Sequence, residues 1–199
     1  DISVRAALLQ KANALADAFN ETGAQLDELA FDVSKDIETK MMDINSYARQ
    51  LANVNEQIKY LKVTGNPAND LRDHRDYLVD SLAKIVGINV YENNDGTISV
   101  TINGNMLVNG LDYHELDINQ YQTNGELRWD DSGNPALLTG GEIGALITIK
   151  NTIPEIVDQL DNLLTTLANR TNALHAKGVD LNSNIPGDEN PFFQVTKDG

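Results

Sequence analysis

Apolar residues recur at a seven-residue interval along residues 3–62. Two rows follow this interval in the second half of the stretch: Ile37, Ile44, Leu51 and Ile58, and Tyr47, Val54 and Leu61. Two more follow it upstream: Leu15, Thr22 and Leu29, and Phe19, Leu26 and Val33. Sustained heptads predict a coiled-coil-like helix, which would be about 90 Å long if unbroken. Gly23 interrupts the pattern, and the sequence leaves open whether the helix continues through it.

A second helix is predicted after a break at Gly65 and Pro67. Glycine tolerates the left-handed backbone at a helix end, and proline cannot continue a helix. Asn69 is expected to cap the new helix through its side-chain oxygen. Arg72 and Asp76 are four apart and are expected to pair on its outer face. Its apolar face carries Leu71, Leu78, Leu82 and Ile85, and Gly87 follows its end.

The period changes to two after Gly87, which predicts short antiparallel strands. Alternating apolar residues and turn signals place strands at 88–90, 98–102, 106–108, 113–118 and 127–129, with an edge strand at 135–139. Asp95-Gly96 and Asn103-Gly104 are strong hairpin turns because they suit positive φ. Further turns are expected at 124–125 and 132–134. Such a small sheet needs a helix against its apolar face.

Gly140 and Gly141 end the strand region, and the helical period then returns. Its main row is Leu146, Ile153, Leu160, Leu167 and Leu174, with a paired row of Ile149, Ile156 and Leu163. This seam is expected to pack against the heptads of residues 30–62. Pro154 lies inside it, and the sequence does not decide whether it kinks the helix or starts a new segment.

These patterns predict an α+β fold: an elongated bundle of long coiled-coil-like helices with an inserted antiparallel β meander. The expected helical domain is discontinuous and takes residues 1–87 and 141–177. The β domain takes residues 88–140. Residues 178–199 are polar and read as an irregular tail or a connection to another domain.

Composition narrows the function classes. The chain has 199 residues, 41% of them hydrophobic, so it can form a substantial core. Acidic residues outnumber basic ones by 30 to 15, and the net charge of -15 argues against binding nucleic acid or an anionic membrane. There is no cysteine, so a disulfide framework is excluded. No apolar run is long enough to span a membrane.

The residues that could support chemistry form weak patterns. Asp70, Asp73, His74 and Asp76 are potential metal ligands, but their spacing does not place them on one helical face. Residues 180–184 begin like a calcium loop, which then fails because Ile185 and Pro191 replace the required Gly and Glu. The three histidines show no zinc-site spacing. We therefore expect no catalytic residue, no metal and no cofactor.

Several motifs in a fixed order resemble the flagellar hook-associated protein 1 family. The first are Val4–Leu9, Leu15–Asn20 and Gln25–Leu29, followed by Asn55-Glu-Gln57-Ile58. Later matches are Asp95-Gly96, Leu107–Gly110 and Pro191-Phe-Phe193. The motif residues expected to be structural are Asn69, Asp70, Leu71, Asp73, Arg75, Asp76, Gly140, Gly141, Gly144, Asp180, Leu181 and Asn182. Arg72 and His74 depart from the family pattern.

The resemblance implies a non-enzymatic structural subunit at the junction between hook and filament of the bacterial flagellum. It implies export through the flagellar secretion apparatus and an extracellular location. The implied partners are the hook protein and the other hook-associated proteins. The family's terminal segments are not found in this sequence, so the chain resembles the middle of the molecule. Ring assembly is expected to need those segments, and the isolated chain is expected to be a monomer. The alternatives are a generic coiled-coil binding module and a metal-dependent hydrolase.

Overall fold

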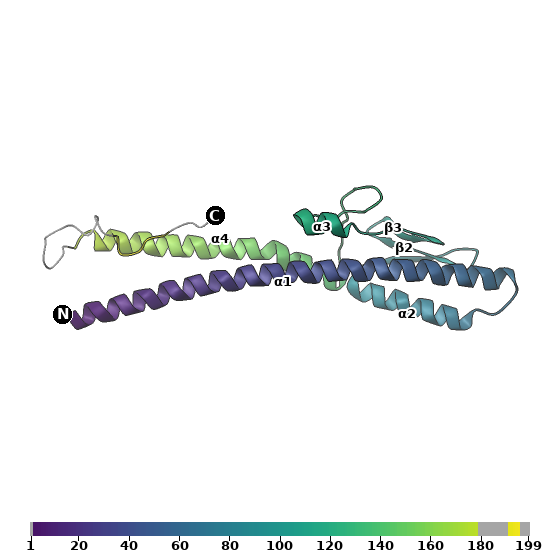
Figure 1. Cartoon of the computed structure of the whole chain (residues 1–199), viewed down its shortest axis with the longest axis horizontal. Coiled ribbons are helices and arrows are strands. Elements are labelled where there is room, and N and C mark those ends of the chain that lie inside the picture. The colour runs from purple at the N-terminus through teal and green to yellow at the C-terminus, as the bar shows by residue number, and fades with distance from the viewer. Residues whose placement is uncertain (1, 179–190, 196–199) are drawn as a thin grey trace. The chain divides into compact units, whose positions relative to one another are not determined.

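The chain forms two compact units joined by two long helices. The structure is a computed structural model, and it describes residues 2–178 and 191–195. One unit contains Asp1–Leu29 and Asn151–Gly199, and the other contains Ala30–Lys150. Helices α1 (Ile2–Val63) and α4 (Gly141–His175) each contribute to both units (Figure 1). The predicted β region lies within the second unit, and the division into domains made from the sequence remains a proposal.

Both long helices are continuous. The predicted helix over residues 3–62 is confirmed, and α1 passes through Gly23 without a break. A side chain at Gly23 would meet nothing within 4 Å, so no close packing requires glycine there. Pro154 lies within α4 rather than at its start. Since proline has no N–H, the helix loses one backbone hydrogen bond at that turn.

The second unit contains the predicted antiparallel meander. Strands β1 (Asn89–Glu92), β2 (Ile98–Ile102), β3 (Asn105–Asn109) and β4 (Asp112–Tyr113) form one sheet in the order β1-β2-β3-β4. The turn between β2 and β3 has φ of 48° at Asn103 and 85° at Gly104. Two successive positive φ values characterise the tight hairpin turn predicted from Asn-Gly. The α+β fold class is therefore confirmed.

The predictions for the end of the meander were wrong. The expected strand at 113–118 reduces to Tyr113 in β4 and one isolated bridge from Leu116. A short helix, α3 (Ile118–Asn124), follows it. Asp117 starts this helix by accepting a hydrogen bond from the Gln120 N–H at 2.9 Å. Two isolated bridges, Leu116 with Trp129 and Arg128 with Pro135, replace the other predicted strands.

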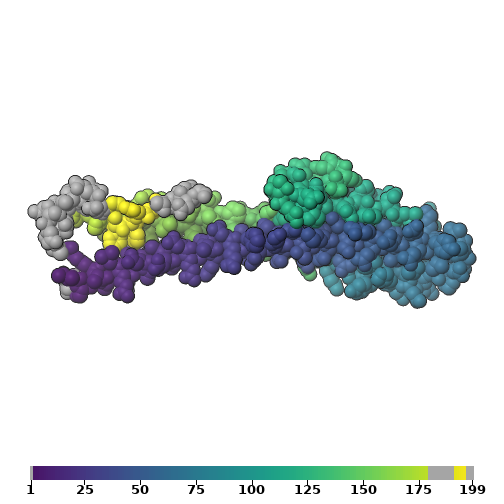
Figure 2. All heavy atoms as spheres, viewed as in Figure 1, coloured from purple at the N-terminus to yellow at the C-terminus, as the bar shows by residue number. Residues whose placement is uncertain are grey.

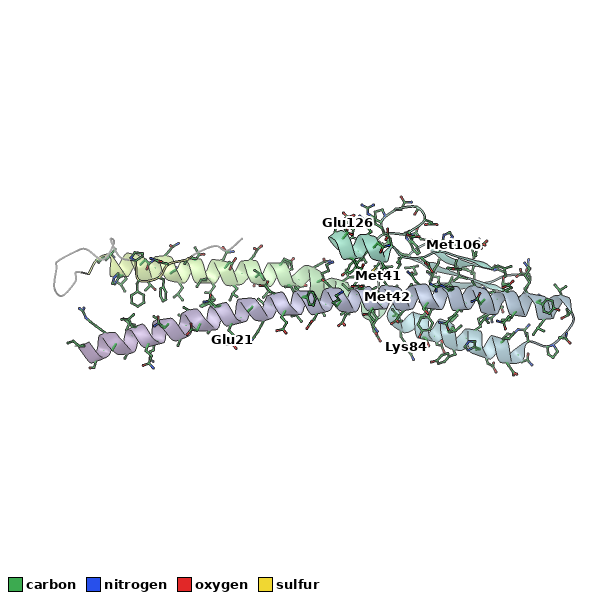
Figure 3. The ribbon with its side chains drawn as sticks, in the orientation of Figure 1. Glu21, Met41, Met42, Lys84, Met106 and Glu126 are labelled. Carbon is green, nitrogen blue, oxygen red and sulfur yellow. The ribbon has the colours of Figure 1, made fainter. Side chains whose placement is uncertain are left out.

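The core of the second unit surrounds the C-terminal half of α1. Ile37, Ile44, Leu51 and Ile58 have no exposed surface, as their heptad row predicts. Helix α2 (Asn69–Ile85) runs along this half of α1 and buries Leu78, Leu82 and Ile85. All of β2 is buried. Met41 is fully buried whereas its neighbour Met42 is 46% exposed, which marks the edge of the buried face (Figure 3).

Two buried asparagines fasten α1 to the β region. Asn45 donates to the Leu116 carbonyl at 2.9 Å and accepts from the Leu116 N–H at 2.8 Å. Asn55 accepts from the Ile98 N–H at 3.0 Å and donates to the Ile98 and Gly110 carbonyls at 2.8 and 2.7 Å. Each amide thus binds one residue's N–H and C=O together, as a neighbouring strand would. Figure 2 shows the atoms of this region gathered against α1.

We predict that Asn55→Leu destabilises the protein by about 3 kcal/mol, because it leaves a buried N–H and two carbonyls without partners. Asn53→Leu is the matched control, since Asn53 is exposed on the same helix; it should change stability by less than about 0.5 kcal/mol. Urea unfolding followed by circular dichroism measures both. Equal losses would contradict the role assigned to Asn55.

Candidate interaction surface

The Asn69 motif forms the start of α2 but does not cap it in the predicted way. Asn69 is the first residue of the helix, and Ala68 precedes it without a side-chain hydrogen bond. The prediction that Asn69 is the cap was therefore wrong. The Ala68 carbonyl instead accepts from the Arg72 N–H at 3.0 Å. Asp70 lies in the first turn, where a negative charge favours the helix dipole.

Arg75 is the motif residue with a buried side chain. Its side chain is only 8% exposed, and its guanidinium donates to the Gly96 carbonyl and to Asp76, both at 3.3 Å. Asp76 therefore pairs with Arg75, and the predicted pair with Arg72 was wrong. Leu71 is half-buried, while Asp73 and His74 are exposed. The motif thus attaches α2 to the turn between β1 and β2.

The same turn is held from α1. Lys59 pairs with Asp95 at 3.1 Å, and Lys62 donates to the Asn94 carbonyl at 2.7 Å. Asp95 also accepts from the N–H and hydroxyl of Thr97. These hydrogen bonds from Thr97, with Lys59 beside them, lower the pKa of Asp95 to about 2. The turn at residues 93–97 is therefore where α1, α2 and the sheet meet.

Gly140, Gly141 and Gly144 allow the start of α4 to pass close to the end of α2. A Cβ at Gly141 would lie 2.4 Å from the Ile85 carbonyl carbon, and one at Gly144 would lie 3.2 Å from the Thr139 carbonyl carbon. Gly140 and Gly141 also have positive φ, of 70° and 59°. The start of α4 therefore passes so close to the end of α2 that side chains do not fit. The remaining motif residues, Asp180, Leu181 and Asn182, lie outside the described residues.

The histidines do not form a site together. His74 is exposed on α2, His114 contacts Asp131 at 2.5 Å, and the rings of His175 and Phe192 are 5.6 Å apart. Within residues 2–178 and 191–195, no three His, Cys, Asp or Glu side chains gather closely enough to hold a metal ion. Among the same residues, no helix is long and apolar enough to cross a membrane.

The first unit is built on an antiparallel pair formed by α1 and α4. The α4 seam was predicted to pack against residues 30–62 of α1. This was wrong for the C-terminal part of α4, because residues 151–175 belong to the unit that contains residues 2–29 of α1. Small residues of α1 lie on the side of this seam at Ala12, which is buried, and Ala16, which is half-buried. Ile153, Leu160 and Leu167 of α4 are also buried or half-buried, as their row predicts.

On each helix, one of the two predicted apolar rows is exposed instead of buried: Leu15, Thr22 and Leu29 on α1, and Ile149, Ile156 and Leu163 on α4. Leu15 and Leu29 of α1 are 40% and 44% exposed, and Ile156 and Leu163 of α4 are 43% and 58% exposed. In an antiparallel pair, the positions just before the seam residues on the two helices fall on the same flank. We call this flank the neutral strip: Leu8, Leu15, Ala18, Thr22, Gln25 and Leu29 of α1, and Ile156, Gln159, Leu163 and Thr166 of α4.

Acidic residues avoid the neutral strip. The acids described in these helix segments occupy the other positions of the heptad: Asp17, Glu21, Asp27, Glu28, Glu155, Asp158 and Asp161. Glu21, for example, lies on the side of α1 away from α4 (Figure 3). By heptad position, Lys11 of α1 and Arg170 of α4 fall on the same flank, and both are exposed. Neighbouring exposed apolar residues often mark an interaction surface, so the neutral strip is the candidate interaction surface of the first unit.

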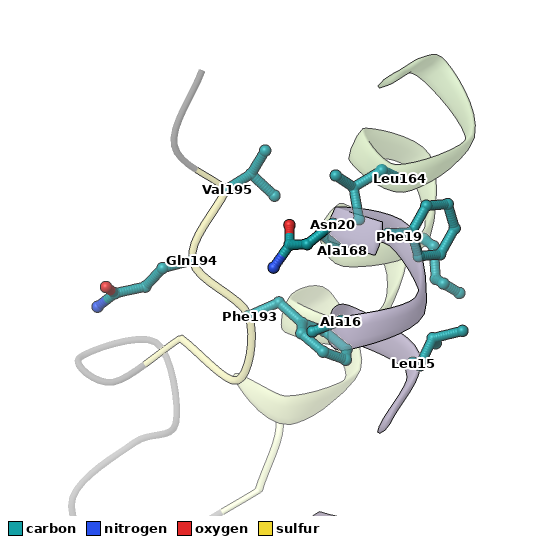
Figure 4. A pocket seen from close by; sticks show the side chains of 10 residues that line it. Leu15, Ala16, Phe19, Asn20, Leu164, Ala168, Phe193, Gln194 and Val195 are labelled. Carbon is teal, nitrogen blue, oxygen red and sulfur yellow. The ribbon is translucent and has the colours of Figure 1, made fainter. Parts of the chain in front are cut away.

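The opposite flank of the helix pair is covered by residues 191–195. Asn172 donates to the Phe193 carbonyl and accepts from the Phe193 N–H, both at 2.8 Å. Figure 4 shows Phe193 and Val195 on one side of a small pocket and Leu15 on the other, with Ala16 and Ala168 between. The described part of the chain therefore covers one flank as far as the pocket at Leu15, and leaves the other residues of the neutral strip without such a cover.

Comparisons with known proteins identify the family. A sequence model described as the flagellar hook-associated protein FlgK helical domain matches residues 1–193. The chain belongs to this family. Flagellar hook-associated protein 1 of Salmonella typhimurium is 34% identical over 208 residues, covering 98% of the chain and 37% of that protein. The Bacillus subtilis protein of the same name is 26% identical and covers 98% of the chain.

A solved structure supports the same assignment. The flagellar hook junction protein FlgK from Burkholderia pseudomallei matches with a TM-score of 0.76 and 30% identity over 94% of the chain. That match covers 36% of the solved chain. The chain thus spans less than half the length of these FlgK relatives. What the whole relatives do is therefore carried over only as a proposal.

We predict that Arg75→Lys destabilises the chain by about 1–2 kcal/mol, because lysine cannot reproduce the forked guanidinium contacts of a buried arginine. Arg72→Lys is the matched control on the same helix and should stay within about 0.5 kcal/mol, since Arg72 is exposed. Thermal unfolding measures both. Similar losses for the two variants would show that burial of Arg75 contributes nothing.

The low pKa of Asp95 predicts an acid-sensitive contribution to stability. A carboxylate whose pKa is lowered in the folded state stabilises above its unfolded pKa of 3.8 and loses that effect as the pH falls through about 2. Wild type should therefore be more stable than Asp95→Asn above about pH 4, and the gap should shrink toward about pH 2. Urea unfolding from pH 7 to pH 2 measures it. A gap that does not change with pH would contradict the assignment.

Proposed function

We propose that the chain is the helical part of a non-enzymatic structural subunit of the bacterial flagellum at the hook–filament junction. The observation that supports this most directly is the family match over residues 1–193. The architecture is consistent with such a role, because the described residues of the two long helices leave apolar side chains exposed on one flank. The subunit would be exported by the flagellar secretion apparatus and would act outside the cell.

The neutral strip is the surface through which this part of the subunit makes its contacts. Leu15, Ile156 and Leu163 supply apolar area, and the absence of acids along them lets a partner helix pack there without meeting negative charge at the contact. An amphipathic helix with leucine or isoleucine every three or four residues fits such a groove.

The partners would be the hook protein and the other hook-associated proteins. Assembly into a ring would depend on segments of the full-length protein that this chain does not contain. The isolated chain, of 21.8 kDa, would remain a monomer because copies with a charge of -15 repel one another. A generic coiled-coil binding module is the second candidate, and the same neutral strip would support it.

A strain that lacks the gene for the full-length protein tests the function. We expect its hooks to carry no filaments, and the wild-type gene to restore them. Filaments of normal number and length in the deletion strain would reject the junction role. They would leave the coiled-coil module as the better explanation.

We predict that Leu163→Asp in the full-length protein reduces swimming several-fold and leaves the helical domain folded. A charge on the neutral strip should oppose helix docking, whereas Leu163 is already 58% exposed and contributes little to the fold. Soft-agar swimming and electron microscopy of hooks measure assembly, and circular dichroism measures folding.

Asn162→Asp is the matched control for that experiment. It adds the same charge one residue away, on the side of α4 that already carries Glu155 and Asp158. We expect it to swim as wild type does. Equal swimming by both variants would show that the neutral strip is not a contact surface.

A further inference from the structure

The sheet of the second unit has an edge that no other described strand covers. The strand order is β1-β2-β3-β4, so β1 is an edge strand, and all four of its residues are exposed. Natural sheets usually protect their edges with very short strands, proline, lysine or a bulge. The other edge strand, β4, has only two residues. β1 is longer, contains neither proline nor lysine, and pairs with β2 without a bulge, so it lacks these protections.

The register of β1 shows which main-chain groups lie on this edge. Asn93 donates its N–H to the Thr97 carbonyl at 2.9 Å. The register continues from there with Glu92 opposite Ile98. Hydrogen-bonded and non-hydrogen-bonded positions alternate in an antiparallel pair, so the N–H and C=O groups of Val90 and Glu92 point away from β2. Within residues 2–178 and 191–195, no hydrogen bond reaches these four groups.

The edge is fixed in place before any partner binds. The turn that follows β1 is fastened to α1 by Lys59 and Lys62, and to α2 by Arg75. A strand that is already ordered loses little conformational freedom when another segment pairs with it. Val90 and Tyr91 are 41% and 54% exposed, and successive side chains point to opposite faces of a strand. A segment that pairs with β1 can therefore bury apolar area on both faces.

The charges near the edge favour one kind of partner. The side chain of Glu92 is 78% exposed. Arg75 lies 4.0 Å from it but only 3.3 Å from Asp76, so one buried cation serves two exposed carboxylates. The two lysines of α1 bind the turn instead, one of them at Asp95. A cation directly opposite Glu92 would stabilise a cross-strand pair, whereas a like charge would oppose it.

A second copy of β1 would not supply that cation. Antiparallel registers that join two copies through their outward main-chain groups place Glu92 opposite Ile88, Val90 or Glu92 of the second copy. None of these residues is basic. The net charge of -15 on each copy adds repulsion. These observations favour a different protein as the partner.

We infer that the edge of β1 binds an extended segment of another protein as an added antiparallel strand, with a lysine or arginine of that segment opposite Glu92. The two segment residues opposite Val90 and Glu92 each donate an N–H and accept at a C=O. Strand addition of this kind gains affinity from main-chain hydrogen bonds and specificity from alternate side chains. The contact belongs to the second unit and does not depend on the neutral strip.

Nuclear magnetic resonance of the ¹⁵N-labelled chain tests this inference. The probe is a cyclic β-hairpin peptide whose front strand reads Ser-Lys-Tyr-Val-Thr, so that its lysine lies opposite Glu92 and its valine opposite Val90. We expect the amide protons of Val90 and Glu92 to shift downfield and to saturate. The amide proton of Tyr91, which points toward β2, should shift less. A response that does not saturate, or one centred elsewhere on the chain, would overturn the inference.

Methylation of backbone nitrogens in the peptide provides the matched control. N-methylation of the front-strand lysine and valine removes both donors to β1, so binding should weaken about tenfold. N-methylation of two outward amides on the back strand should leave the affinity unchanged. Equal binding by the two methylated peptides would overturn strand addition. A peptide with glutamate in place of the lysine should bind about fivefold more weakly, and equal affinity would overturn the charge assigned to the partner.

A variant of the chain tests the same edge from its own side. Val90→Pro removes an N–H that points away from β2, and proline is tolerated on an edge strand for this reason. Binding of the lysine peptide should weaken about tenfold while the circular dichroism spectrum stays unchanged. Wild-type affinity in the folded variant would overturn the inference. If the variant does not fold, the methylated peptides decide the question on the wild-type chain.

Discussion

The structure depends on a hydrogen-bonding arrangement in which asparagine side chains take the place of a β-strand. A primary amide carries a donor and an acceptor at a spacing that matches the N–H and C=O of one residue, so it can satisfy both at once. Asn45 and Asn55 use it to fix α1 against the β region, and Asn172 uses it to fix Phe193 against α4. Apolar packing holds elements together, but it does not fix where along a helix the neighbouring element lies. The paired hydrogen bonds of the asparagines fix that position.

That register decides where the remaining contacts can form. With Asn55 bound to Ile98, the turn at residues 93–97 lies at the end of α1, within reach of Lys59 and Lys62. Arg75 of α2 reaches the same turn through the Gly96 carbonyl. The start of α4 then has to pass the end of α2 so closely that only glycine fits at Gly141. Motifs that are far apart in the sequence therefore serve one assembly of helices and strands.

Much of this fold follows from the sequence, because heptads and turn residues act locally. The long first helix, the hairpin at Asn103-Gly104 and the return to helix after Gly140 were all predictable. The partner of the α4 seam was not, since a heptad shows that a face is apolar but not which helix covers it. Asn55 lies outside the apolar rows, and the sequence carries no sign that its amide binds the backbone of Ile98 and Gly110. Helix α3 is too short for periodicity, although Asp117 three residues before Gln120 was an available signal.

The most direct test of this account is amide hydrogen exchange at Leu116 and Ile98, whose N–H groups donate to Asn45 and Asn55. Leu116 lies in an isolated bridge with Trp129, where a backbone amide would ordinarily exchange through local fluctuations. If the asparagines fix the β region to α1, both amides should exchange only through global unfolding of their unit, as slowly as Leu51 in the middle of the α1 core. Exchange of Leu116 as fast as that of an exposed turn residue such as Asn94 would contradict the account.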